Sequence, residues 1–229
     1  MRLYDASVRE LRYITPNEPA AWIDCPSEAI PAPGRYSAAW SVADSSAPLS
    51  TPLFAAQIAQ DGFLAAPPIP SSWEPGAKLE LRGPLGRGFT LPASARRLAL
   101  AALAETSARL LPLIPMALQS DLAVALFSDF PIPDIPSAVE IYPVQDLPEA
   151  LAWADLLLLD APVSELERLR VKLHLKPEDW LPCPAQALVL TAMPCSGIAE
   201  CGACFVPGRH RWKQACQDGP VFDLNELSW

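Results

Sequence analysis

The sequence has little positive charge. Lysine and arginine number 17 against 26 aspartate and glutamate residues, so the formal net charge is −9 and the isoelectric point lies near 4.7. Proteins that bind nucleic acid neutralise its phosphates with basic side chains, and this charge balance has the wrong sign for that task. We therefore expect no nucleic acid and no anionic membrane surface among the partners.

Long hydrophobic runs are also missing. The run at 156–159 is ended by Asp160 and the run at 98–104 by Glu105, whereas a bilayer-spanning helix needs roughly 20 apolar residues. The N-terminal segment MRLYDASVRELRYI has no continuous apolar stretch of the kind found in secretory signals. We expect no membrane insertion and a cytoplasmic location.

The sequence lacks the common catalytic signatures. It contains no G-x-S-x-G, H-E-x-x-H or Walker loop, and its carboxylates are scattered. Of its 2 histidines, His174 lies in an alternating stretch and His210 lies between two C-terminal cysteines. We offer neither as a metal ligand, and we expect no catalytic residue.

Glycine is scarce and proline abundant, 10 against 27, and hydrophobic residues make up 51% of the chain. Such a chain is too apolar for disorder and too rich in proline for a helical bundle. Short β-like stretches between turn clusters predict an antiparallel β-barrel domain of the flavin type over 1–92. Apolar strands that alternate with helical patterns predict an α/β domain with a parallel sheet over 93–190. The fold class is thus α+β and α/β, with a loop-rich C-terminal segment over 191–229.

Four of the 6 cysteines gather in that segment, with the spacing C-x5-C-x2-C-x11-C: Cys195, Cys201, Cys204 and Cys216. Thiolates supply negative charge and soft donor atoms, and plant-type [2Fe–2S] sites use the similar spacing C-x4-C-x2-C with a distant fourth cysteine. We predict a [2Fe–2S] cluster on these four residues. Zinc and an empty site are the alternatives, although structural zinc usually takes two C-x2-C pairs.

Three motifs resemble one family. They are MPCSGIAECGACFV and CQDGPVFDLNEL in the C-terminal segment, and RGPLGRGF at 82–89. They are similar to signatures of the iron–sulfur and flavin subunit of class B dihydroorotate dehydrogenase, which belongs to the ferredoxin-reductase-like superfamily. The resemblance implies a barrel, a nucleotide-type sheet and a four-cysteine tail in that order.

The resemblance also implies an NAD(P) site, and here the chain departs from the family. The family places a glycine-rich loop after the first strand of the sheet, because a bare backbone can approach a pyrophosphate closely. The matching stretch LALAALAETSARLLPL contains no glycine and carries Glu105. Like charges at short range repel, so we predict that the NAD(P) site is lost.

The resemblance implies an FAD site as well. The family's flavin strand carries an arginine for the pyrophosphate, whereas this chain has no arginine between Arg35 and Arg82. Gly83, Gly86 and Gly88 in the RGPLGRGF turn are the remaining flavin-contacting candidates, and the same glycines also suit a hairpin turn. FAD binding stays open at this point.

Four retained cysteines beside a degenerate dinucleotide loop predict an electron-transfer subunit without catalysis of its own. It would relay single electrons between partner subunits of a redox complex that includes a flavoprotein. Two alternatives remain: an intact FAD- and NAD(P)H-dependent reductase subunit of a dihydroorotate dehydrogenase-type enzyme, and a structural subunit with a zinc or empty site.

Overall fold

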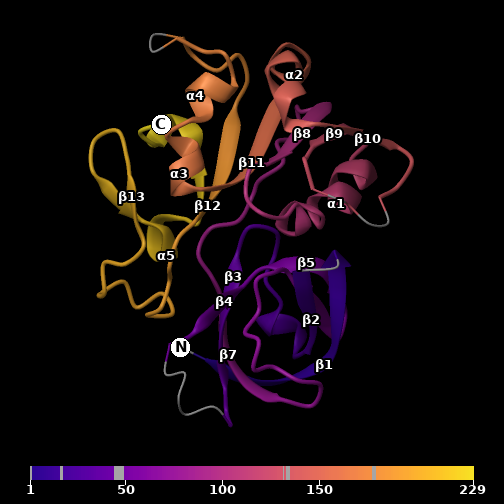
Figure 1. Ribbon diagram of the computed structural model, residues 1–229, viewed down its shortest axis with the longest axis vertical. Coiled ribbons are helices and arrows are strands. Elements are labelled where there is room, and N and C mark those ends of the chain that lie inside the picture. Colours follow the sequence, from indigo (N-terminus) through magenta and orange to yellow (C-terminus); the bar gives the residue numbers. More distant parts are fainter. Residues whose placement is uncertain (1, 16–17, 44–48, 131, 133–134, 177–178) are drawn as a thin grey trace.

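The computed structural model describes residues 2–15, 18–43, 49–130, 132, 135–176 and 179–229. Figure 1 shows two stacked halves, with the first strands of the chain below and the later strands and helices above. No helix within these ranges is long and apolar enough to cross a bilayer.

The lower half is a seven-stranded antiparallel sheet in the order β4-β3-β7-β1-β2-β6-β5. Its two outer strands follow each other in the chain with only Phe54 between them, so the sheet curls into a barrel. The strands are β1 (Leu3–Thr15), β2 (Glu18–Asp24), β3 (Tyr36–Ser41), β4 (Thr51–Leu53), β5 (Ala55–Ala59), β6 (Gly62–Ala65) and β7 (Lys78–Leu85).

Apolar side chains that alternate with exposed ones along each strand fill the interior of the barrel. On β7, Leu79 and Leu81 are buried in the barrel core, whereas Lys78 and Glu80 face solvent. Successive strand side chains point to opposite faces, so every second residue enters the interior. Phe63 is among the largest side chains of this core.

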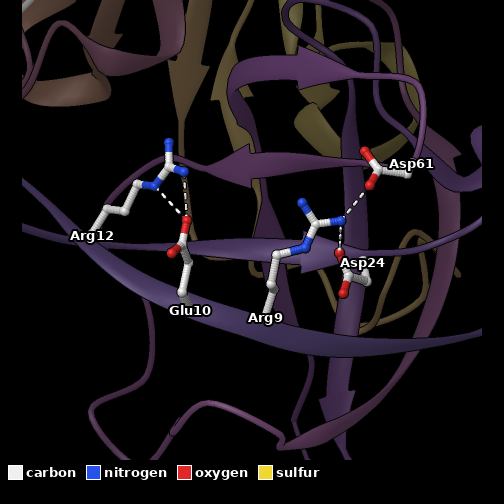
Figure 2. Close-up of polar contacts among 5 residues, drawn as sticks. All are labelled: Arg9, Glu10, Arg12, Asp24 and Asp61. Atoms are coloured by element: carbon white, nitrogen blue, oxygen red, sulfur yellow. Dashed lines mark hydrogen bonds and ion pairs between the residues drawn. The ribbon is translucent and has the colours of Figure 1, made fainter.

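An exposed charge cluster marks an irregularity in β1 (Figure 2). Pairing with β2 shifts register between Val8 and Glu10, which leaves Arg9 as the extra residue. The Arg9 guanidinium bonds to Asp24 and to Asp61, and Arg12 pairs with Glu10. These ion pairs are exposed to solvent. They therefore contribute little to the free energy of unfolding.

The upper half is a six-stranded sheet in the order β10-β9-β8-β11-β12-β15. The first five strands are parallel, and β15 pairs antiparallel with β12. The strands are β8 (Arg97–Ala102), β9 (Ala123–Phe127), β10 (Val139–Tyr142), β11 (Leu156–Pro162), β12 (Ala185–Leu190) and β15 (Val221–Asp223). A separate hairpin pairs β13 (Phe205–Pro207) with β14 (Trp212–Gln214).

Short helices connect the parallel strands, as βαβ crossovers require. They are α1 (Leu113–Gln119), α2 (Leu147–Trp153), α3 (Val163–Leu166) and α4 (Leu169–Lys172), and a further short helix, α5 (Ala215–Asp218), lies between β14 and β15. The central strand β11 is buried along most of its length because both faces of the sheet are covered.

The predicted fold class is confirmed: an antiparallel barrel, a parallel sheet and a C-terminal cysteine segment. The last of these is not a detached tail, because β15 extends the parallel sheet and Phe222 and Leu224 are buried in its core. The domain limits at residues 92 and 190 stay predictions.

Candidate functional site

The cysteine segment begins with a tightly wound loop between β12 and β13. Ser196, Gly197, Ala199 and Gly202 all adopt left-handed backbone angles, with φ between 56° and 76°. For residues other than glycine this conformation costs about 1–2 kcal/mol each, and it persists only where the surrounding structure enforces it. The turns bend the chain back on itself and bring its cysteines together.

Two of the thiols form a buried pair. Cys204 and Cys216 are 1% and 4% exposed, and their Sγ atoms lie 3.3 Å apart without a disulfide bond. Burial raises the pKa of Cys216 to about 12, with Cys204 and Cys195 as further causes.

The other two thiols form a more open pair. Cys195 is half-buried and Cys201 is exposed. Burial by itself would raise the pKa of Cys195, but the backbone N–H of Ala199, the Cys201 thiol, and the N–H groups of Cys201 and Ile198 outweigh it and lower the pKa to about 7. N–H groups aimed at a sulfur favour its thiolate form, which is the form that binds metal.

The four predicted ligands are thus brought together as two pairs, with Cys195 also contacting Cys216. Within the described ranges, no three His, Cys, Asp or Glu side chains surround one point as they would for a single metal ion. Four thiols in contact with one another are a donor set that an iron–sulfur cluster can use. His210 lies in the exposed turn of the β13–β14 hairpin, and His174 follows α4.

The barrel supports the cysteine loop from below. The hydroxyl of Ser196 donates a 2.7 Å hydrogen bond to Oγ of Ser50, and both side chains are buried. The Tyr36 hydroxyl donates to the carbonyl oxygen of Cys216 at 3.5 Å. Burial raises the pKa of Tyr36 and the nearby thiols raise it further, so this hydroxyl stays protonated and can donate.

A buried cation lies on the same face of the barrel. Arg82 is 7% exposed, and its Nε has no hydrogen-bond partner among the residues that the structure describes. Arg82 pairs across the ladder with Ala38, and Ala38 belongs to the core that contains Cys204 and Cys216. A buried guanidinium needs a compensating negative charge, and a centre built on four thiolates supplies one. The four-thiol donor set and the buried Nε of Arg82 together fit an iron–sulfur cluster.

Of the three flavin candidates of the sequence analysis, Gly83 lies in β7, and Gly86 and Gly88 follow that strand. A Cβ on Gly83 would come 2.6 Å from Oγ of Ser37, and one on Gly86 would come 2.6 Å from the carbonyl oxygen of Gly219. A Cβ on Gly88 would lie 2.6 Å from the carbonyl oxygen of Pro33. Protein packing therefore accounts for each of these glycines without a ligand.

A cavity of about 490 Å³ lies between the two halves of the molecule. Its walls include residues that follow β8, β9 and β11, together with Pro67 and Pro68 from the barrel. The chain leaves β8 in one direction to β9 and returns on the other side to β11, and such a switch point is where open α/β sheets bind ligands. The exposed Glu105 lines this cavity and gives it negative charge.

A buried ion pair closes the floor of the same crevice. Nε of Arg109 donates to Oδ2 of Asp160 at 2.9 Å, and the two side chains are 4% and 0% exposed. Nη1 of Arg109 also donates to the carbonyl oxygen of Pro67 at 2.5 Å, which ties the sheet to the barrel. Sequence reasoning missed this pair because it treated Asp160 only as the end of a leucine run. A carboxylate inside a buried strand could have served as the signal.

Comparison with known proteins agrees with this geometry. Residues 191–228 match the family described as the iron-sulfur cluster binding domain of dihydroorotate dehydrogenase B. No curated protein sequence matches the chain.

Solved structures share the fold. An NADH-dependent reduced ferredoxin-NADP oxidoreductase superposes with a TM-score of 0.76 at 18% identity, covering 97% of this chain and 89% of that one. Phthalate dioxygenase reductase, described as transferring electrons from pyridine nucleotides to [2Fe–2S], gives 0.55 at 12% identity, covering 83% and 70%. A ferredoxin NADP+ reductase from Neisseria gonorrhoeae with bound FAD and NADP gives 0.58 at 11% identity, covering 82% and 99%. The chain therefore has a ferredoxin-reductase-like fold that ends in a segment matching the iron–sulfur cluster binding domain of dihydroorotate dehydrogenase B.

Proposed function

We propose that this protein is an iron–sulfur electron-transfer subunit that relays single electrons between partner subunits of a redox complex. Cys195, Cys201, Cys204 and Cys216 would hold a [2Fe–2S] cluster, which accepts and releases one electron at a time. The partner subunits would include a flavoprotein. The free thiols throughout the chain favour a reducing compartment, and we place the protein in the cytoplasm.

One contrast carries the proposal. The cysteine loop has the features of a metal-binding loop: strained turns, two thiol pairs and N–H groups directed at sulfur. The dinucleotide crevice has instead Glu105 on its wall and the Arg109–Asp160 pair in its floor. An arginine already bound to a carboxylate is a poor partner for a diphosphate, and Glu105 would repel one.

The chain's own residues would manage the electron. Buried Cys204 and Cys216 exclude water from one side of the site, and the exposed Cys201 opens the other side toward a partner. The Arg82 guanidinium would favour the more negative, reduced state. We further propose the limits 1–92, 93–190 and 191–229 for the barrel, sheet and cluster segments.

A second candidate function is an FAD- and NAD(P)H-dependent reductase subunit. The 490 Å³ cavity at the switch point favours it, since that is where this class of fold takes a nucleotide. Gly83, Gly86 and Gly88 would then be the candidates for contact with the flavin. A third candidate is a structural subunit with zinc or no metal. Its cysteine segment would only pack against the rest of the protein.

Anaerobic purification tests all three. Iron, acid-labile sulfide, zinc and extractable flavin are quantified on one sample, and visible absorbance is followed with dithionite and with NADH. We expect about two irons and two sulfides per chain, bleaching by dithionite, and no bleaching by NADH. Cys204→Ser should lose the iron, while the matched control Cys183→Ser, another buried thiol, should keep it. Stoichiometric zinc without sulfide, or NADH-driven bleaching with bound FAD, would each overturn the proposal.

A further inference from the structure

An exposed aromatic surface adjoins the cysteine loop. It consists of residues 205–214, the hairpin of β13 and β14, which we call the aromatic hairpin. The side chains of Phe205 and Trp212 are 46% and 65% exposed, and their rings meet edge to face with centroids 6.5 Å apart. The Phe205 ring lies against Gly202, whose Cβ position would be 3.2 Å from it. The aromatic hairpin therefore continues directly from the loop that carries the exposed Cys201.

The charge of the aromatic hairpin is opposite to that of the chain. It contains Arg209, Arg211 and Lys213 and no acidic residue, in a protein whose net charge is −9. Lys213 is engaged by Glu226 at 2.7 Å, and Arg211 lies 3.8 Å from Asp218.

Arg209 differs from its neighbours. Its guanidinium stacks 4.7 Å from the ring of Trp180, itself 68% exposed, and it makes no ion pair among the described residues. Arginine and tryptophan that are open to solvent and close together have the composition of interface hot spots, whereas lysine and glutamate are the usual surface residues.

We propose that the aromatic hairpin is the docking surface for an acidic electron-carrier protein that exchanges one electron with the cluster. This inference rests on the proposed function. The rings of Phe205 and Trp212 would supply apolar contact area, and Arg209 and Arg211 would steer and orient the acidic partner. In the exchange one electron passes between the two centres; no bond forms or breaks and no proton is transferred.

Charge complementarity selects this occupant over a second copy of the chain. In a two-fold dimer the same patch meets itself. Two basic patches would then face each other, and like charges at close range repel. A partner with acidic residues around an exposed redox centre meets no such repulsion.

The probe for this proposal is a purified flavodoxin with a strongly acidic surface. Stopped-flow absorbance follows one electron passing from its hydroquinone to the oxidised cluster, leaving the flavodoxin semiquinone. The variants are Arg209→Glu and Trp212→Ala, each with a matched control. Lys78→Glu makes the same charge reversal on an exposed lysine of β7, and Tyr13→Ala removes an aromatic ring that is 67% exposed on β1. Figure 1 shows β13 and β1 on opposite sides of the molecule.

We expect Arg209→Glu to lower the second-order rate constant at low ionic strength by tenfold or more and Trp212→Ala by about threefold to tenfold. Both controls should stay within twofold of the parent protein, and added salt should remove the effect of Arg209→Glu. The rate of reduction by dithionite, a small molecule, should be unchanged in all four variants. Equal rates for the hairpin variants and their controls would overturn the proposal.

A second measurement separates this inference from the proposed function. Calorimetric titration of flavodoxin into the chain needs no electron transfer, so it reports docking even where the cluster is absent. Binding that is lost in Arg209→Glu but kept in Lys78→Glu supports the docking surface. A concentration-dependent dimer that Trp212→Ala abolishes would assign the aromatic hairpin to a second copy and overturn the acidic partner.

Discussion

The Ser196 hydroxyl donates a hydrogen bond to Oγ of Ser50 across 2.7 Å, although 146 residues separate the two in the chain. Both side chains are buried, and Oγ of Ser50 in turn faces the carbonyl oxygen of Pro194 at 3.4 Å. This contact joins the cysteine loop to the barrel just before β4. It makes the shape of the loop depend on the barrel.

Replacing Ser50 with alanine should destabilise the protein. The variant leaves the Ser196 hydroxyl buried without its partner, which costs about 1–3 kcal/mol. Ser50→Ala/Ser196→Ala should lose less than the sum of the two single variants, because they share one contact. Urea denaturation measures each free energy of unfolding, with exposed Ser27→Ala as the control. Additive losses would show that the two hydroxyls act independently.

Gly197→Ala should lower iron retention, because alanine would be strained there and would also contact Tyr36. The site has φ +76°, and a Cβ would lie 3.0 Å from the Tyr36 hydroxyl. Gly76→Ala is the matched control, since Gly76 has φ +89° and nothing within 4 Å of its Cβ position. Both variants should lose about 1–2 kcal/mol from the backbone alone, but only Gly197→Ala should also lose iron per chain on gel filtration. Equal iron contents would contradict this role.

Arg109→Met should lower the free energy of unfolding by about 3–5 kcal/mol, because it strands a buried carboxylate. Burial raises the pKa of Asp160 above its ordinary value, and Arg109 offsets part of that rise. A folded-state pKa above the unfolded one gives stability that is present at low pH and lost as pH rises through the folded value. The deficit of Arg109→Met against the parent should therefore be larger at pH 8 than at pH 5, as measured by urea denaturation. Arg109→Met/Asp160→Leu should recover most of the loss; a deficit independent of pH would refute the account.

In the cluster-free protein, Cys195 should react faster than the buried Cys216 and Cys25 near neutral pH. The pKa of Cys195 is lowered to about 7, while burial raises the pKa of Cys216 and of Cys25 to about 12. The thiolate is the nucleophile, so alkylation of Cys195 by iodoacetamide should reach half its maximal rate near pH 7. Peptide mass spectrometry follows each thiol, with Cys25 as the slow control. Alkylation of Cys216 before Cys195 at pH 7 would run against this prediction.

Arg82→Met should lower the reduction potential of the cluster. A positive charge stabilises the more negative reduced state, and its removal should shift the one-electron equilibrium by about tenfold, or roughly 59 mV. Arg82→Lys keeps the charge and should stay near the parent value. Spectroscopic redox titration measures all three proteins. A potential that follows side-chain size rather than charge would assign Arg82 a packing role alone.

Much of this fold can be predicted from local patterns in the sequence. The alternation of β7 and the leucine run of β11 predict a half-buried barrel strand and a doubly covered parallel strand, because side-chain period depends on which faces are buried. The cysteine spacing predicted a metal centre, because short loops that contain glycine can bring nearby thiols together. The match of residues 191–228 to an iron–sulfur cluster binding domain agrees with that prediction.

The long-range contacts could not be predicted. No local pattern links Ser50 to Ser196 or Arg109 to Asp160, because each pair forms only when distant segments pack against each other. The contact between Cys204 and Cys216 and the burial of Arg82 likewise depend on how the chain packs in three dimensions. Residue types and spacing thus determined the elements and the candidate ligands, while tertiary packing decided their environment, because burial and electrostatic potential arise from neighbours that the linear sequence does not place.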